Sequence, residues 1–172
     1  MRLMSSVAIG FAATLLAAPL SAQASFIVAG GLAVPVGNTA DAVKSGFNVT
    51  AGLGIKPPLA PIGLRLEGMW NEMDFKSGVG SGATRILGGA ANVTFSGAAL
   101  PMGYLIGGLG MYNVATPDIA GSTSATKFGF NIGAGLNFPL TGISTFVEAR
   151  YHRVSTEGEA LSFVPITFGI RF

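Results

Sequence analysis

Two short stretches of the chain carry side chains that can hold or transfer protons, and in both the charged residues alternate with apolar ones. The stretches are IGLRLE, residues 62–67, and FVEARYH, residues 146–152. The candidates are Arg65 and Glu67 in the first stretch and Glu148, Arg150 and His152 in the second. A repeat of two is the period of a β-strand, so each stretch presents its charges on one face.

The strands that must position these charges have a clear signature elsewhere in the chain. From Phe128 to Phe138, phenylalanine, isoleucine, alanine and leucine alternate with glycine and asparagine. From Gly46 to Ile55, large apolar residues again alternate with glycine, asparagine and threonine. A sheet with one face in water usually carries charged side chains on that face. Because the second face here has none, it does not suit a water-exposed sheet surface.

The composition excludes several classes of function. The chain has 172 residues, a formal net charge of +2, 49% hydrophobic residues and no cysteine. Only 10% of residues are charged, against roughly 25% in soluble domains. The near-zero charge leaves no field for nucleic acid. Without cysteine the chain forms no disulfides or thiolate sites, and its single histidine excludes a multi-histidine metal site. We therefore expect no metal and no cofactor.

The first 24 residues have the layout of a secretory signal peptide. They begin with Arg2, run apolar from about Val7 to Ala18 and end in Ala22-Gln23-Ala24. The apolar run is shorter than the about 20 residues that a membrane-spanning helix needs. We expect cleavage after Ala24, with residues 25–172 as the mature domain.

Turn signals divide the mature chain at seven places, which predicts eight strands. The connections are residues 36–44, 56–61, 76–83, 96–101, 115–125, 139–142 and 155–160. Longer and shorter connections alternate, as at the two rims of an up-and-down barrel. Closed barrels are the only sheets that leave no backbone group unpaired in lipid. We therefore expect an all-β, eight-stranded antiparallel transmembrane barrel with its large apolar face on lipid.

In such a barrel the charged side chains must point inward, because a charge on lipid near the midplane costs roughly 2–4 kcal/mol. The third and seventh strands are diametrically opposed in a ring of eight. The interior of so small a barrel is narrow enough for long side chains to meet. We expect Arg65 to pair with Glu148 and Glu67 with Arg150. With His152 they would fill the interior with a network of near-zero net charge.

Aromatic residues cluster toward the two ends of the predicted strands, as in the girdles that mark bilayer interfaces. One set comprises Phe26, Phe95, Phe138 and Phe172, and the other comprises Phe47, Trp70, Tyr112, Phe128 and Tyr151. On the fifth strand, where both parities carry large residues, we expect the tyrosines to face outward. Pro165 lies within the eighth strand and cannot donate a ladder hydrogen bond, which predicts a bulge or an end of regular pairing there.

The chain ends in VPITFGIRF, in which apolar residues alternate up to a terminal phenylalanine. Together with the eight strands, this resembles the small outer-membrane β-barrel family that includes the OmpA transmembrane domain, OmpX and opacity-type proteins. In that family such an ending resembles the signal read by the outer-membrane assembly machinery. The residues that match this signal are Phe168, Ile170 and Phe172.

The resemblance implies a bacterial outer-membrane protein with both termini in the periplasm. Its partners would be outer-membrane lipid and the assembly machinery, and we expect a monomer. The implied function is structural or interactional, with a side-chain-filled interior. A small-solute porin is the main alternative, because fold does not settle function.

Two further functions, an acyl hydrolase and a soluble carrier, depend on particular residues. His152, Ser155 and Glu157 could form an acyl-hydrolase set. Outer-membrane lipid A deacylases, however, have histidine and serine two residues apart, where this chain has Val154, and strand parity sends Ser155 to the other face. We therefore expect the protein not to be an enzyme. A soluble lipocalin-like carrier would need a hydrophilic outer face, which the uncharged second face of the strands does not provide.

Overall fold

A computed structural model describes residues 23–78, 82–97, 100–118, 121–156 and 160–172. Within these residues, eight strands form one closed antiparallel barrel, in which each strand pairs with its neighbours in the sequence and β1 pairs with β8. The strands are β1 (Gln23–Pro35), β2 (Gly46–Lys56), β3 (Ile62–Asp74), β4 (Ala83–Phe95), β5 (Gly103–Asp118), β6 (Gly121–Pro139), β7 (Ser144–Val154) and β8 (Leu161–Arg171). The structure therefore confirms the predicted all-β up-and-down barrel.

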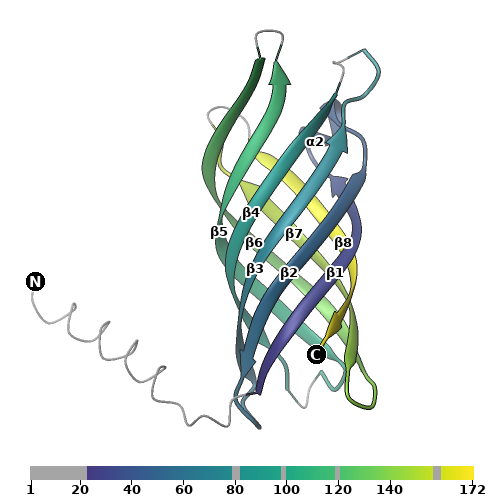
Figure 1. The fold of residues 1–172 in the computed structure, drawn as a ribbon, viewed down its shortest axis with the longest axis vertical. Coiled ribbons are helices and arrows are strands. Elements are labelled where there is room, and N and C mark those ends of the chain that lie inside the picture. The colour runs from purple at the N-terminus through teal and green to yellow at the C-terminus, as the bar shows by residue number, and fades with distance from the viewer. Residues whose placement is uncertain (1–22, 79–81, 98–99, 119–120, 157–159) are drawn as a thin grey trace, which may run out of the picture.

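The two ends of the barrel differ (Figure 1). At one end, here the terminal end, β1 begins and β8 ends, and short turns join β2 to β3, β4 to β5 and β6 to β7. At the other end, here the α2 end, a short helix, α2 (Thr39–Ala42), lies in the connection between β1 and β2. Among the described residues no helix has the length and hydropathy to cross a bilayer.

The predicted signal peptide, residues 1–24, falls almost wholly outside the described residues. The structure begins at Gln23, and Ala24 pairs with Ile55 at the start of β1. The cleavage site after Ala24 therefore stays a prediction.

Along each strand, one set of side chains points outward and the other fills the barrel. On β6, Phe130 and Ile132 are exposed, whereas Asn131 between them is buried. On β2, Val49 and Leu53 are exposed in the same way. The alternation read from the sequence thus assigns the faces of these strands correctly, with the large apolar side chains outside.

The tyrosines of β5 are an exception, and the predicted outward placement of Tyr104 and Tyr112 is wrong. Both rings lie inside, with 3% and 0% of their surface exposed, and Leu109 faces outward instead. Glycines on neighbouring strands make room for the rings: a Cβ at Gly135 would lie 2.4 Å from the ring of Tyr104, and one at Gly88 would lie 2.7 Å from that of Tyr112. Each hydroxyl also finds a buried polar partner, which the apolar outer face cannot offer.

The predicted connection 115–125 is also shorter than expected. β5 and β6 continue as a paired hairpin beyond the rest of the barrel, with Thr116 opposite Thr123 and Asp118 opposite Gly121. A strand that extends past the rim needs no apolar face, because its ladder is held by backbone hydrogen bonds. The polar composition of residues 115–125 therefore does not indicate a loop over the whole segment.

Pro165 interrupts the pairing of β8 on one side only. Against β7, the ladder has Ala149 opposite Ile166 and then resumes with His152 opposite Phe163. The register is the same before and after the gap, so no residue is bulged. Pro165 itself stays opposite Ala33 of β1. The structure thus shows neither a bulge nor an end of regular pairing at Pro165, but a local gap in the ladder with β7 that closes again at Phe163.

Candidate functional site

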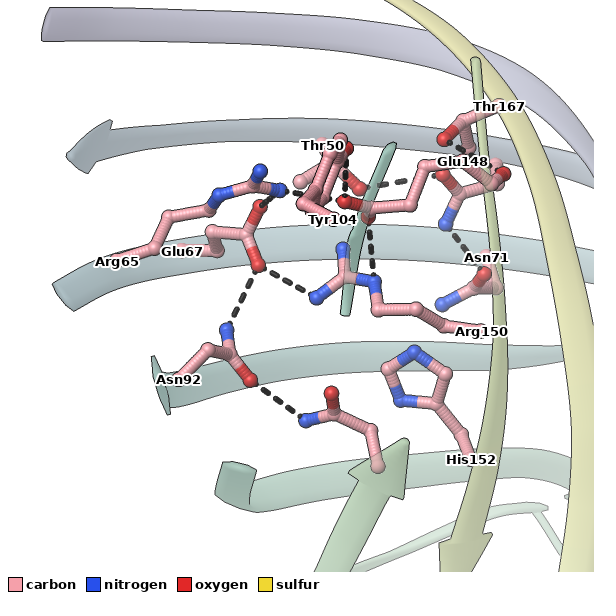
Figure 2. Close-up of polar contacts among 12 residues, drawn as sticks. Thr50, Arg65, Glu67, Asn71, Asn92, Tyr104, Glu148, Arg150, His152 and Thr167 are labelled. Atoms are coloured by element: carbon pink, nitrogen blue, oxygen red, sulfur yellow. Dashed lines mark hydrogen bonds and ion pairs between the residues drawn. The ribbon is translucent and has the colours of Figure 1, made fainter. Parts of the chain in front are cut away.

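The centre of the barrel holds two arginines and two glutamates in a closed ring of ion pairs. Arg65 Nη1 lies 2.8 Å from Glu148 Oε2 and 3.2 Å from Glu67 Oε1. Arg150 Nη1 lies 2.6 Å from Glu67 Oε2, and its Nε lies 2.7 Å from Glu148 Oε1. Figure 2 shows the two arginines reaching the carboxylates from opposite sides. We call these four side chains the charge ring.

The charge ring sits on two strands that lie opposite one another in the barrel. Arg65 and Glu67 come from β3, and Glu148 and Arg150 come from β7. None of the four side chains is more than 5% exposed. Removing such charges from water costs several kcal/mol per ion, and only well-formed ion pairs and hydrogen bonds offset that cost. The two charges of each sign leave the ring with no net charge.

Neutral side chains complete the coordination of the carboxylates. Tyr104 on β5 donates its hydroxyl to Glu148 Oε2 at 2.6 Å. Asn92 on β4 donates to Glu67 Oε2 at 2.8 Å, and it accepts a hydrogen bond of 2.8 Å from Asn131 on β6. The polar network therefore continues from the ring around the wall formed by β4, β5 and β6. Every carboxylate oxygen in it has at least one donor, as a buried charge requires.

A second, smaller polar group lies on β2 and β3. Asn48 donates to Asn71 Oδ1 at 2.6 Å, and Thr50 donates to Asn48 Oδ1 at 3.1 Å. All three residues are buried. These contacts use the uncharged face that the sequence shows on β2, so its polar residues serve to fill the interior rather than to meet solvent.

His152 stands apart from the charge ring, although it follows the same strand parity. Its Nδ1 lies 3.0 Å from the hydroxyl of Tyr112, and its ring stacks on Phe163 with 5.0 Å between the centroids. The side chain is fully buried. The expected interior placement of His152 is thus observed, but its partners are aromatic rings and not the ion pairs.

Apolar side chains gather on both sides of the charge ring along the barrel axis. Toward the α2 end, a cluster includes Met69, Met73, Ile86, Tyr112 and Phe163. Toward the terminal end, a smaller cluster joins Ile27, Ala29 and Phe146. The charge ring thus lies between two apolar clusters along the barrel axis, and its side chains are at most 5% exposed.

The expected aromatic girdle residues, apart from Tyr112, have their side chains on the outer face. Six of them are between 39% and 58% exposed: Phe26, Phe47, Trp70, Phe95, Phe128 and Phe138. Tyr151 is half-buried and its hydroxyl lies 3.0 Å from Ser162 Oγ. At the end of the chain, Phe168 and Phe172 are exposed and Ile170 is half-buried. Their roles in membrane anchoring and assembly stay predictions.

The residues of the hydrolase alternative are not brought into one site within the described chain. His152 is fully buried, whereas Ser155 is exposed and its backbone N–H donates to Phe128 O. Glu157 lies outside the described residues. In the part of the chain that the structure describes, no three histidine or acidic side chains are close enough to hold a metal ion.

Comparison with solved structures finds the same barrel architecture in other proteins. No family model and no curated protein matches the chain. Among solved structures, Neisserial surface protein A matches with a TM-score of 0.66 and 14% identity over 87% of this chain and 97% of that one. The chain has the fold of a small outer-membrane β-barrel. A major outer membrane protein from Thermus thermophilus shares this barrel fold, with a TM-score of 0.57 and 12% identity over 87% of this chain and 98% of that one.

The same barrel fold occurs in Ail, an outer membrane protein of Yersinia pestis solved in a phospholipid bilayer nanodisc. It matches with a TM-score of 0.51 and 20% identity over 87% of this chain and 99% of that one. At these identities the likeness concerns the fold.

Proposed function

We propose that this chain is a bacterial outer-membrane barrel with a structural or surface-interaction role, whose interior is closed to solutes. The observation that carries the proposal is the charge ring. Arg65 and Glu67 on one wall meet Glu148 and Arg150 on the opposite wall without a gap between the ion-pairing atoms. A passage along the axis would have to separate these pairs.

The outer surface supports a membrane location. Exposed large apolar side chains occur on each of the eight strands, whereas soluble monomers rarely expose a contiguous apolar patch of more than a few hundred Å². The charges on the outward faces, such as Glu72, Arg85 and Arg153, lie at the α2 end. An apolar band bordered by charges suits a barrel whose α2 end meets water beyond the bilayer.

The direction of insertion follows from the two ends. In up-and-down outer-membrane barrels the short turns face the periplasm and the longer connections face outside. Both termini would then be periplasmic, and the α2 end with the β5–β6 hairpin would form the surface that contacts other molecules. Phe168, Ile170 and Phe172 would present the assembly signal at the periplasmic side.

Cysteine labelling in intact Gram-negative cells tests this location and direction, because the natural chain has no cysteine. Lys76→Cys places a thiol at the α2 end, and Thr141→Cys places one in the turn between β6 and β7; both positions are exposed. A membrane-impermeant maleimide should label Lys76→Cys in intact cells and Thr141→Cys only after the outer membrane is opened. Labelling of Thr141→Cys alone in intact cells would reverse the proposed direction, and recovery of the protein in the soluble fraction would refute the membrane location.

A further inference from the structure

A small cavity opens at the terminal end of the barrel, below the charge ring. Its volume is about 80 Å³, and its lining includes Lys56, Arg65, Ser96, Asn137 and Arg171. Three of these side chains are cationic and none is acidic. A buried water needs roughly 10–15 Å³ of such space, so the cavity has room for a group larger than one water molecule.

Arg65 contributes a hydrogen-bond donor that the charge ring does not use. Its Nη1 contacts both Glu67 and Glu148, whereas its Nη2 is buried and has no acceptor among the described residues. In Figure 2 that second terminal nitrogen carries no dashed line. The side chain as a whole is only 2% exposed. A buried guanidinium N–H without an acceptor is costly, and it points to an acceptor that the chain itself does not supply.

The other two cations of the cavity are held by neutral groups. Arg171 donates to Asn137 Oδ1 at 3.3 Å and lies 5.5 Å from the ring centroid of Phe146. Lys56 donates to Ser96 Oγ at 2.6 Å. Within the described chain, neither has an acidic side chain at ion-pair distance.

The side chains at the terminal end carry a net positive charge outside the charge ring. Glu67 and Glu148 are neutralised by Arg65 and Arg150 in the charge ring. The remaining described acidic residues all belong to the α2 end: Asp41, Glu72, Asp74 and Asp118. Lys56 and Arg171 thus bring two positive charges to a small cavity whose lining contains no acidic side chain.

We propose that this cavity binds a phosphate-type oxyanion, either free phosphate or the phosphate of a lipid headgroup. Arg65 Nη2 would donate to one oxygen from the inner wall, and Arg171 and Lys56 would approach others nearer the mouth. Guanidinium groups suit the oxygens of phosphate because their donors are fixed in a planar fork, and lysine adds a point charge. The site goes beyond the proposed structural role and does not depend on it.

Titration calorimetry of the refolded full barrel in phosphate-free maltoside micelles tests the site, with sodium phosphate as the probe at low ionic strength. Arg171→Gln and Lys56→Gln together should weaken binding at least tenfold, because they remove two of the three cationic side chains that line the cavity. Arg85→Gln at the α2 end is the matched control and should change the affinity less than twofold. Heat-modifiable gel migration checks that each variant folds, and Lys56→Gln alone, at an exposed residue, provides a variant with little risk to folding.

A second titration with a short-chain phosphatidic acid distinguishes the source of the anion. If inorganic phosphate binds and the lipid shows no dependence on Lys56 and Arg171, the ligand is a free oxyanion. If only the lipid binds, and the same two substitutions weaken it, the ligand is a headgroup. The proposal is overturned if neither probe binds, or if Arg85→Gln weakens binding as much as the two cavity substitutions do.

Discussion

Replacing Glu148 by alanine should lower the free energy of unfolding of the barrel by about 3–5 kcal/mol, the range for removing one partner of a buried ion pair. Glu148 accepts hydrogen bonds from Arg65, Arg150 and Tyr104 at 2.6–2.8 Å. Without it, Arg65 keeps a single carboxylate partner and the ring acquires a net positive charge in a region bordered by apolar clusters. The loss should appear in urea unfolding of the protein in lipid vesicles, followed by the fluorescence of Trp70, the only tryptophan of the chain.

Two matched variants separate the ring from general effects of substitution. Glu148→Gln keeps the size of the side chain and one acceptor oxygen, so it should destabilise less than alanine does. Glu72→Gln breaks the ion pair with Arg85, whose side chain is 62% exposed, and should cost no more than about 1 kcal/mol. Equal, small effects at Glu148 and Glu72 would show that the charge ring contributes little to stability.

Placing an arginine on the outer face at mid-strand should destabilise the barrel by roughly 2–4 kcal/mol, because the charge would meet lipid near the midplane. Leu66 is the position for this test. It lies on the outer face of β3, is 62% exposed, and stands midway between Ile62 at one rim and Trp70 toward the other. Vesicle unfolding as for Glu148 would measure the change for Leu66→Arg.

The control for Leu66→Arg is the same substitution at Ile62, which lies on the same face at the start of β3 and is 52% exposed. Near the bilayer interface a charge costs only about 0–1 kcal/mol. The expected result is thus a steep difference between two positions of similar exposure. If both substitutions cost little, the outer face meets water, as it would in a soluble lipocalin-like carrier.

The inward direction of the charges could be predicted from the sequence because strand parity is strict and the penalty for a charge on lipid is large. Arg65 and Glu67 alternate with leucines, and Glu148 and Arg150 alternate with valine, alanine and tyrosine, so each stretch has one acceptable orientation. The opposition of the third and seventh strands then follows from an eight-membered ring. Together these constraints are enough to predict from the sequence alone that the four side chains lie within reach of one another.

The tyrosines of β5 could not be assigned in this way, since both faces of that strand carry large residues. The deciding signal lies on other strands: Gly135 and Gly88 leave the space that the rings of Tyr104 and Tyr112 occupy. Pairing glycines with aromatics across strands requires the register, which the sequence alone leaves open by a residue or two. The same uncertainty hid the role of Asn92, a polar residue in an apolar strand that donates to Glu67.

The length of the β5–β6 hairpin could also not be predicted from the alternation of apolar residues. That pattern reports where a strand has an apolar face, and it stops where the strand continues without one. The pairing of Thr116 with Thr123 depends only on backbone groups and on the turn beyond them. Loop boundaries at the α2 end are therefore the weakest part of a prediction made from composition.

Planar-bilayer recording of the unmodified protein tests the closed interior most directly. The charge ring and the apolar clusters on either side of it predict no steady conductance above that of the bare bilayer when the folded barrel is inserted. A large, steady conductance from the unmodified protein would contradict the account, because ions could cross only if the pairs of Arg65 with Glu148 and of Arg150 with Glu67 did not close the barrel, and it would favour a small-solute porin.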